Sequence, residues 1–307
     1  MTFHFAPVQG HTDAAYRHFH AANYGNHTDY YTPFIRLEKG TIRPRDLKDF
    51  TSELNEGTHL VPQIIFRDKE ELYSLVRLMK ENGATEIDLN MGCPFPLQTG
   101  HGRGAATVGN AEVAAAVENV VNDNGDVRFS VKMRLGFSSP EEWHTLMPFL
   151  NNVKLDHIAV HPRVARQQYV GELHLDQFGQ ILKESRNPVV FNGEIKTPED
   201  IKDIIGKFPE ISGVMIGRGL LARPSLVAEY LSGEELEKEE RLRLMLRFHR
   251  QLLDYYTSNL CGDSQIISKI KPFWEYAEEE IGRKSYKLIK KAVNIAKYHS
   301  AVASILN

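Results

Sequence analysis

A single thiol stands where it could take part in chemistry. Cys93 lies between Gly92 and Pro94, directly after the apolar run "EIDLNM". The chain holds only one other cysteine, Cys261, and two cysteines are too few for a disulfide framework or a thiolate zinc site. We therefore predict that Cys93 is a free thiol and that the chain has no metal centre. A buried structural cysteine is the alternative, because buried cysteines are common and reactive ones are rare.

The segment that follows this thiol is rich in glycine. Gly100, Gly102 and Gly104 stand within "FPLQTGHGRGAATVGN". Glycine gives a backbone conformational freedom that other residues lack. The segment is therefore predicted to be a mobile flap with these glycines as hinges and Cys93 at its fixed end.

Short apolar runs alternate with helix-like segments through most of the chain. The eight runs are "FHFAPV", "YYTPFI", "LVPQIIF", "EIDLNM", "RFSVKM", "LDHIAV", "NPVVFN" and "SGVMIG". Helix signals separate them, for example Thr197 as an N-cap followed by Pro198 as the first helical residue. This alternation predicts an α/β fold, a (β/α)8 TIM barrel. A doubly wound open sheet has the same local pattern and is the alternative.

The chain changes character after residue 232. The acidic run "SGEELEKEE" precedes a part without strand signals, so we predict a barrel over residues 1–232 and a C-terminal all-helical domain over residues 233–307. Two rows of cations stand at helical spacing in the second part: Arg243, Arg247 and Arg250, and Lys284, Lys287 and Lys291. One such row is typical of a solvated helix face. Two rows on a small domain indicate a surface that contacts nucleic-acid phosphates.

In a TIM barrel, the residues at the carboxyl ends of the strands share one rim, where the chemistry of the fold takes place. Polar, basic and glycine residues follow the apolar runs of this chain. The residues predicted to lie on the rim include Gln63, Asn90, Cys93, Lys132, Arg134, His161 and Arg163, with residues 7–10, 192–194 and 217–219. A buried core would not need so many polar groups, so the rim is the predicted functional site.

Two loops of this rim could hold a phosphate. "NGE" and "GRG" follow the seventh and eighth runs, where barrels often bind phosphate through glycine amides, and Arg218 could pair with the anion. A flat-ring cofactor over the barrel mouth would place Gln63 and Lys132 at its ring edge, where a cation stabilises a reduced flavin. The alternative for Lys132 is a strand-end lysine that reaches solvent, and for His161 a structural hydrogen bond.

Six segments, in order along the chain, resemble the motifs of the tRNA-dihydrouridine synthases. They are "APVQGHTD", "LNMGCP", "SVKMRLG", "HPRVARQQYVG", "FNGEI" and "GVMIGRG". The resemblance extends over nearly the whole chain, including the helical C-terminal domain. It implies an FMN-dependent enzyme that uses NADPH to reduce particular uridines of tRNA to 5,6-dihydrouridine.

The resemblance also implies roles for individual residues. Cys93 matches the proton donor of the family, and Asn90 would lie close enough to touch the target base. Arg134, Arg163 and the six cations of the helical domain are predicted to contact the RNA. Residues 95–99, "FPLQT", depart from the family pattern because they are more apolar. The residues that match FMN-binding positions are Pro7, Val8, Gln9, Gln63, Lys132, His161, Asn192, Gly193, Glu194, Gly217 and Arg218.

Two other functions remain open. One is a flavin-dependent barrel oxidoreductase that acts on a small pyrimidine, similar to the dihydroorotate dehydrogenases. The other is a catalytically silent RNA-binding relative. The basic helical domain argues against the first, because a small pyrimidine needs no RNA-binding surface.

Composition narrows the class of protein. The chain has 307 residues, of which 42% are hydrophobic and 25% charged, with a net charge of −3, as in an ordinary soluble globular protein. No apolar window reaches the length of a membrane span, and the start of the chain lacks a signal-peptide pattern. We therefore predict a cytoplasmic protein whose partner is tRNA, with no membrane association and no obligate protein partner.

Overall fold

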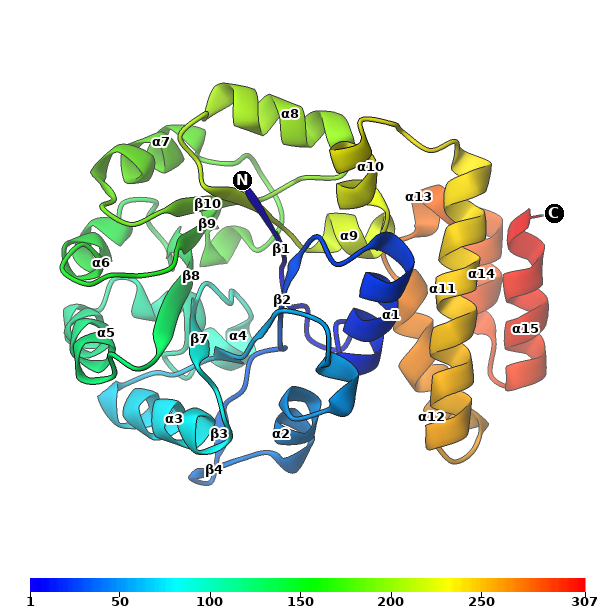
Figure 1. Ribbon diagram of the computed structural model, residues 1–307, viewed down its shortest axis with the longest axis horizontal. Coiled ribbons are helices and arrows are strands. Elements are labelled where there is room, and N and C mark those ends of the chain that lie inside the picture. Colours follow the sequence, from blue (N-terminus) through cyan, green and yellow to red (C-terminus); the bar gives the residue numbers. More distant parts are fainter. Residues whose placement is uncertain (307) are drawn as a thin grey trace.

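Parallel strands form the centre of the molecule (Figure 1). In the computed structural model, which describes residues 1–306, nine strands form one sheet in the order β5-β2-β1-β11-β10-β9-β8-β7-β6. Every neighbouring pair in this sheet is parallel. The strands are β1 Thr2–Phe5, β2 Asp29–Tyr31, β5 Leu60–Val61, β6 Gln63–Ile64, β7 Glu86–Met91, β8 Arg128–Gly136, β9 Ile158–Val164, β10 Val189–Asn192 and β11 Gly213–Ile216.

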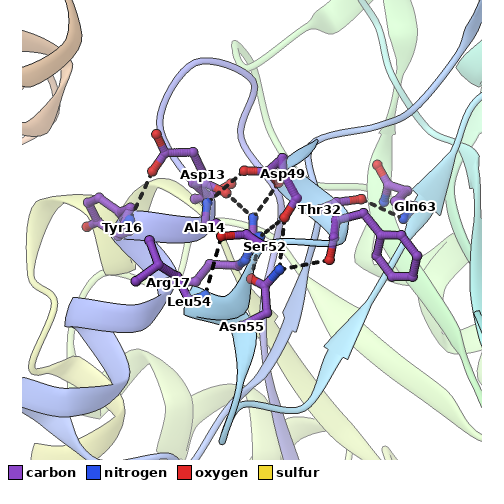
Figure 2. A network of polar contacts seen from close by, with 12 residues as sticks. Asp13, Ala14, Tyr16, Arg17, Thr32, Asp49, Ser52, Leu54, Asn55 and Gln63 are labelled. Carbon is purple, nitrogen blue, oxygen red and sulfur yellow. Dashed lines mark hydrogen bonds and ion pairs between the residues drawn. The ribbon is translucent and has the colours of Figure 1, made fainter. Parts of the chain in front are cut away.

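The sheet closes on itself at Pro62. β5 and β6 lie on either side of this residue, yet β5 pairs with β2 and β6 pairs with β7, so the two ends of the sheet are one run of chain. Proline has no N–H for the ladder, but the Pro62 carbonyl accepts from the Asp88 amide at 2.9 Å. Nearby, the Thr32 hydroxyl accepts from the Gln63 amide at 3.0 Å (Figure 2). The predicted (β/α)8 barrel is confirmed, with its third strand divided in two by the proline.

Helices surround the barrel. The predicted start of α8 is confirmed, because the Thr197 hydroxyl accepts from the Asp200 amide at 3.1 Å and Pro198 is the first helical residue. A small antiparallel hairpin, β3 Leu37–Glu38 and β4 Thr41–Ile42, precedes α2. The helices and 3-10 turns of this part are α1 Ala14–Tyr24, α2 Pro44–Phe50, η1 Glu53–Asn55, α3 Lys69–Glu81, α4 Pro96–Thr99, η2 Gly104–Thr107, α5 Ala111–Asp123, α6 Trp143–Leu150, η3 Ala165–Gln167, α7 Leu175–Glu184, α8 Pro198–Lys207, α9 Arg218–Ala222 and α10 Leu226–Ser232.

Side chains alternate along each strand between the surrounding helices and the barrel interior. In β7, Ile87 and Leu89 are fully buried in the main apolar core. Asp88 and Asn90 point the other way and hydrogen-bond to Gln63 inside the barrel. Only a small apolar cluster fills the interior, formed by Ala6, Tyr31, Val61, Ala159, Val190 and Met215. Much of the interior is therefore polar.

The last part of the chain is helical and lies against the barrel on the side of α1 (Figure 1). Its elements are α11 Lys238–Asn259, α12 Asp263–Ile270, η4 Lys271–Trp274, α13 Glu278–Ile281, α14 Arg283–Lys291, α15 Ile295–Ala303 and η5 Ser304–Leu306. The Phe248 ring of α11 lies 4.9 Å from Tyr16 of α1 and 5.0 Å from Phe273. The apolar core is therefore continuous across the predicted boundary. Among residues 1–306, no helix has the length and apolar character needed to cross a membrane.

Two charged residues fasten α1 to its surroundings (Figure 2). Asp13 caps the helix, and its carboxylate also accepts from the Tyr256 hydroxyl and pairs with Lys269 at 2.6 Å. Arg17 is fully buried and donates to Asp49 at 2.9 Å. The first helix is thus tied both to the 49–55 segment of the barrel and to the helical domain.

A charged cluster lies at the amino ends of β5 and β7. His59 Nδ1 donates to Asp29 Oδ1 at 2.7 Å, and His59 Nε2 donates to Glu86 Oε1 at 3.0 Å. These two hydrogen bonds raise the pKa of His59 from 6.5 to about 10. The imidazolium therefore joins β2, β5 and β7 beside the point where the sheet closes.

Replacing His59 tests this contribution. Because the folded pKa lies above the unfolded one, the stabilisation is complete below pH 6.5 and is lost as pH rises toward 10. At pH 6 we expect His59→Gln to lower the free energy of unfolding by on the order of 1 kcal/mol, since solvent weakens an ion pair as exposed as this one. Urea unfolding of both proteins at pH 6 and pH 10 measures the effect. An equal difference between the proteins at both pH values would contradict it.

Candidate active site

A pocket of about 1160 Å³ opens at the carboxyl ends of the barrel strands. This volume is somewhat above the usual range of about 300 to 1,000 Å³ for ligand pockets. The structure brings together in its wall all the residues predicted to bind the cofactor, together with Cys93, Asn90 and Arg134. The predicted residues that line the pocket are Pro7, Val8, Gln9, Gln63, Asn90, Cys93, Lys132, Arg134, His161, Asn192, Gly193, Glu194, Gly217 and Arg218.

The Cys93 thiol is buried in the wall of this pocket. Asn90 holds its loop, because Asn90 Oδ1 accepts from the amides of Gly92 at 3.1 Å and Cys93 at 2.9 Å. Burial raises the pKa of the thiol, although a hydrogen bond from the Phe95 amide and the charge of Lys132 partly oppose this shift. At neutral pH the thiol is therefore protonated, with cations nearby that can stabilise the thiolate once the proton leaves.

The glycine-rich segment after Cys93 is folded rather than open. It contains α4 and η2, and the buried Arg103 donates to Glu71 of α3 at 3.0 Å. Gly104 has a φ of 62°, and a Cβ there would lie 2.6 Å from the Cys93 carbonyl oxygen and 2.9 Å from the Cys93 Cβ. Where the sequence predicts a mobile flap, the structure shows short helices anchored by an ion pair and packed against the thiol.

β8 places two cations on the pocket wall. Arg134 is buried and donates to the Val164 carbonyl at 3.0 Å. In the described part of the chain, the Lys132 ammonium has no hydrogen bond or ion pair. Burial, reinforced by the charge of Arg134, lowers the pKa of Lys132 to about 8, and burial lowers the pKa of Arg134 to about 10. An anion bound here would compensate Lys132 for its lost hydration.

His161 of β9 is buried and uncharged. Burial lowers its pKa well below 6.5, and the charges of Arg134 and Lys132 lower it further. His161 Nε2 lies 3.3 Å from Nη1 of Arg163, which can only donate, so Nδ1 carries the ring hydrogen. His161 can therefore offer the pocket a hydrogen-bond donor without a charge.

Arg163, predicted to contact RNA, is buried inside the protein. Its guanidinium donates to Glu194 at 2.6 Å and to the Gly171 carbonyl at 2.7 Å, and Glu194 also accepts from Arg218 at 3.0 Å. Burial alone would raise the pKa of Glu194, but the Arg163 hydrogen bond and the two guanidinium charges lower it. Glu194 thus joins the "NGE" and "GRG" loops, and the position of Arg163 does not favour an RNA contact.

Close packing explains a glycine in the "GRG" loop. A Cβ at Gly219 would lie 1.9 Å from the carbonyl oxygen of Ile195, the residue after "NGE". In the "NGE" loop, Asn192 Nδ2 donates to the Met215 carbonyl at 2.7 Å. The two loops therefore lie against each other at the carboxyl ends of β10 and β11.

Two further parts of the wall were not singled out from the sequence. Tyr169 lies in the loop after β9, with the Arg218 guanidinium 4.1 Å from its ring centre and the Phe95 ring 6.4 Å away. The helical domain contributes Glu275, which accepts from His11 Nε2 at 2.9 Å, and the acidic residues 278–280. The sequence could have indicated Tyr169, because it is the one aromatic residue in the polar run "RQQYVG". The sequence held no signal for the acidic wall, because it depends on how the two parts of the chain pack.

The cations predicted for RNA in the helical domain do not line the pocket. Arg243 pairs with Glu239 at 2.8 Å, and Arg247 Nε donates to Asn23 of α1 at 2.9 Å. The other four are exposed: Arg250, Lys284, Lys287 and Lys291. Residues 1–306 also contain no group of His, Cys, Asp and Glu side chains placed to hold a metal ion.

The closed parallel barrel with its pocket at the carboxyl ends of the strands defines a (β/α)8-barrel enzyme. Solved structures share this fold. The old yellow enzyme from Trypanosoma cruzi superposes with a TM-score of 0.53 over 77% of this chain and 89% of its own, at 10% identity. Morphinone reductase does so with a TM-score of 0.53 over 77% and 86%, also at 10% identity.

Within this class, the chain belongs to the family described as Dihydrouridine synthase (Dus), which it matches over residues 4–302. The "Probable tRNA-dihydrouridine synthase 2" of Bacillus subtilis (strain 168) is 27% identical over 83% of this chain and 79% of its own length. The "Probable tRNA-dihydrouridine synthase" of Treponema pallidum (strain Nichols) is 26% identical over 98% and 91%. The second match extends over both the barrel and the helical domain.

Adding a methyl group at Gly104 tests whether η2 holds the thiol in place. Gly104→Ala and Gly102→Ala both put a side chain at a positive φ, which costs on the order of 1 kcal/mol. Only the methyl of Gly104→Ala would clash with Cys93, because the nearest atom to a Cβ at Gly102 is 3.8 Å away. We expect Gly104→Ala alone to change the rate of Cys93 alkylation by iodoacetamide severalfold. Equal rates in the two variants would show that η2 does not position the thiol.

Proposed function

We propose that this protein uses FMN and NADPH to reduce uridines of tRNA to 5,6-dihydrouridine in the cytoplasm. The observation that carries the proposal is the combination of a protonated, buried thiol and an unpaired Lys132 in one pocket. A reduction that adds a hydride and then a proton to a ring double bond needs an acid beside the cofactor. The family of the chain and the names of its relatives support uridine in tRNA as the substrate.

The residues of the pocket fit FMN. The paired "NGE" and "GRG" loops, including Arg218 of "GRG", would hold its phosphate, and Gln63 and Lys132 would contact its ring edge. Lys132 lacks a protein partner, so a negatively charged ring would supply the missing one. His161 would donate a hydrogen bond without adding charge. Reduced FMN would supply the hydride to the β carbon of the uracil ring.

Cys93 completes the reduction. Hydride addition at the β carbon leaves an electron pair on the α carbon, next to the carbonyl. The Cys93 thiol would give its proton to that carbon, and the electron pair would form the new C–H bond. Lys132 and Arg134 stabilise the thiolate that is left, as their lowering effect on the pKa of Cys93 indicates. Water then restores the proton, and the thiol is ready for another turnover.

The helical domain favours an RNA substrate over a small pyrimidine. The exposed Arg250, Lys284, Lys287 and Lys291 and the partly paired Arg243 and Arg247 lie outside the pocket. Cations placed beyond the site are useful to an enzyme whose substrate carries phosphates far from the reacting base. The target base must also leave its stack to enter the pocket, so the rest of the RNA needs a separate grip.

Replacing the thiol separates cofactor binding from chemistry. We expect Cys93→Ala to bind FMN and to accept electrons from NADPH, because neither step uses the thiol. Dihydrouridine formation should fall by about 100-fold or more, the usual contribution of a general acid. Mass analysis of bulk tRNA from cells that lack the gene, rescued with each protein, measures the product.

Cys261→Ser is the matched control, because Cys261 is exposed and lies outside the pocket. It should restore dihydrouridine as well as the wild type does. If tRNA from the deletion strain keeps all its dihydrouridine, and the purified protein forms none, the proposed function is wrong.

A further inference from the structure

An exposed apolar patch lies beside the pocket. Phe95 and Leu97, after the thiol, are 50% and 68% exposed, and Tyr169 and Val170, after β9, are 39% and 77% exposed. The Phe95 and Tyr169 rings lie 6.4 Å apart, so two distant segments form one surface. These four residues, here called the apolar rim, are four of the nine large apolar side chains exposed in residues 1–306. Exposed apolar side chains gathered in this way mark an interaction surface.

The surroundings of the apolar rim indicate what it binds. Phe95 and Tyr169 also line the pocket, so the rim is continuous with the site of the thiol. The guanidinium groups of Arg218 and Arg134 lie 4.1 Å and 5.2 Å from the centre of the Tyr169 ring. Aromatic faces combined with cations are how proteins hold unstacked nucleobases. A protein docked on the rim would instead cover the entrance that the substrate needs.

We propose that the apolar rim covers the nucleobases next to the target uridine when that base leaves its stack. This inference rests on the proposed function and adds the part of the RNA that the rim contacts. Extruding one base exposes the faces of its neighbours to water. Apolar side chains that cover those faces lower the cost of extrusion, as wedge residues do in other nucleic-acid complexes. Phe95 stands two residues after Cys93, so the neighbours would be held beside the proton donor.

Removing the two side chains after the thiol tests this proposal. We expect the double variant Phe95→Ala, Leu97→Ala to bind tRNA about 10- to 100-fold more weakly, the usual effect of losing one or two stacking contacts. The slope of log affinity against log salt should not change, because apolar contacts release no counterions. Leu231→Ala is the matched control, since Leu231 is 49% exposed on α10, and it should bind tRNA like the wild type.

The outcomes are separable. Unchanged tRNA affinity in the double variant overturns the proposal, and so does a weaker affinity that comes with a smaller salt slope. Loss of a wild-type dimer or partner complex at unchanged tRNA affinity would assign the rim to a protein and overturn it as well. A wild-type protein that forms no dihydrouridine would be a failure of the proposed function instead.

A separate observation concerns the thiol loop. Asn90, whose Oδ1 accepts from the Cys93 amide, donates through Nδ2 to Gln63 Oε1 at 2.7 Å. Gln63 Nε2 donates to Asp88 Oδ2 at 2.7 Å, and Ser130 Oγ donates to Asp88 Oδ1 at 2.6 Å. All five residues are buried. The donors therefore run in one direction, from the backbone at the thiol to a carboxylate inside the barrel.

The direction of these hydrogen bonds determines the orientation of the side-chain amides of Gln63 and Asn90. A carboxylate only accepts, so Gln63 must present its NH₂ to Asp88 and its oxygen to Asn90. Asn90 then has its own oxygen free for the amides of the thiol loop. Asp88 itself does not line the pocket. We infer that Asp88 is a positioning residue that orients Cys93 through Gln63 and Asn90, which also rests on the proposed role of the thiol.

Two substitutions in a Cys261→Ser background test this inference. Asp88→Asn can still accept from Gln63 while its NH₂ donates to Ser130, so it should keep the alkylation rate of Cys93 and the kcat for tRNA close to wild type. Asp88→Leu removes the acceptor and should change the alkylation rate severalfold and lower kcat more than it changes KM. Asp88→Ser, too short to reach Gln63, replaces the leucine variant if that variant does not fold.

A folded Asp88→Leu or Asp88→Ser protein with wild-type alkylation rate and kcat overturns the inference. So does a loss in Asp88→Asn as large as that in Asp88→Leu, because the chain of donors would then not be what matters. Alkylation needs no RNA, so this readout remains valid if the proposed reaction is wrong.

Discussion

The site depends on one constraint, the two-residue period of strands in a closed parallel barrel. Every second side chain of β7 and β8 must point inward, and the register sets Asp88 beside Ser130 and Asn90 beside Lys132. Polar groups in such an interior need partners, because burial removes them from water. In the deeper layer Asp88 and Ser130 satisfy each other. In the layer at the mouth Lys132 has no partner within residues 1–306, so a bound anion would supply the interaction that its ammonium group lacks.

Burial and neighbouring charges together determine which side chains of the pocket are charged. Arg163 of β9 and Arg218 share Glu194, so these three side chains together keep a net positive charge although one of them is a carboxylate. His161 is surrounded by cations and stays neutral, and Cys93 stays protonated. Acidic groups line the part of the pocket wall that the helical domain supplies. The site therefore favours an anion on the barrel side while it keeps one transferable proton close by.

The sequence predicted the features that depend on residues close together in the chain. The ends of the runs "EIDLNM" and "RFSVKM" placed Asn90 and Lys132 on the rim, and both line the pocket. The helix cap at Thr197 was also placed correctly. Other features depend on contacts between distant residues and left no local signal. The folded segment after Cys93 needs the Arg103–Glu71 ion pair, and the burial of Arg163 needs Glu194 from another loop. The sequence also showed a strand through Pro62, and its division follows only from the different neighbours that its two halves find.

The closure at Pro62 links ligand binding to the integrity of the barrel. The chain there belongs to two pairings at once, and Gln63, the next residue, bonds to Thr32 on one side and to Asp88 on the other. Gln63 therefore helps to hold the barrel closed and also forms part of the pocket wall. Opening the barrel between β5 and β6 would break the contacts of a molecule bound to Gln63. The binding free energy of that molecule therefore adds to the free energy needed to open the barrel.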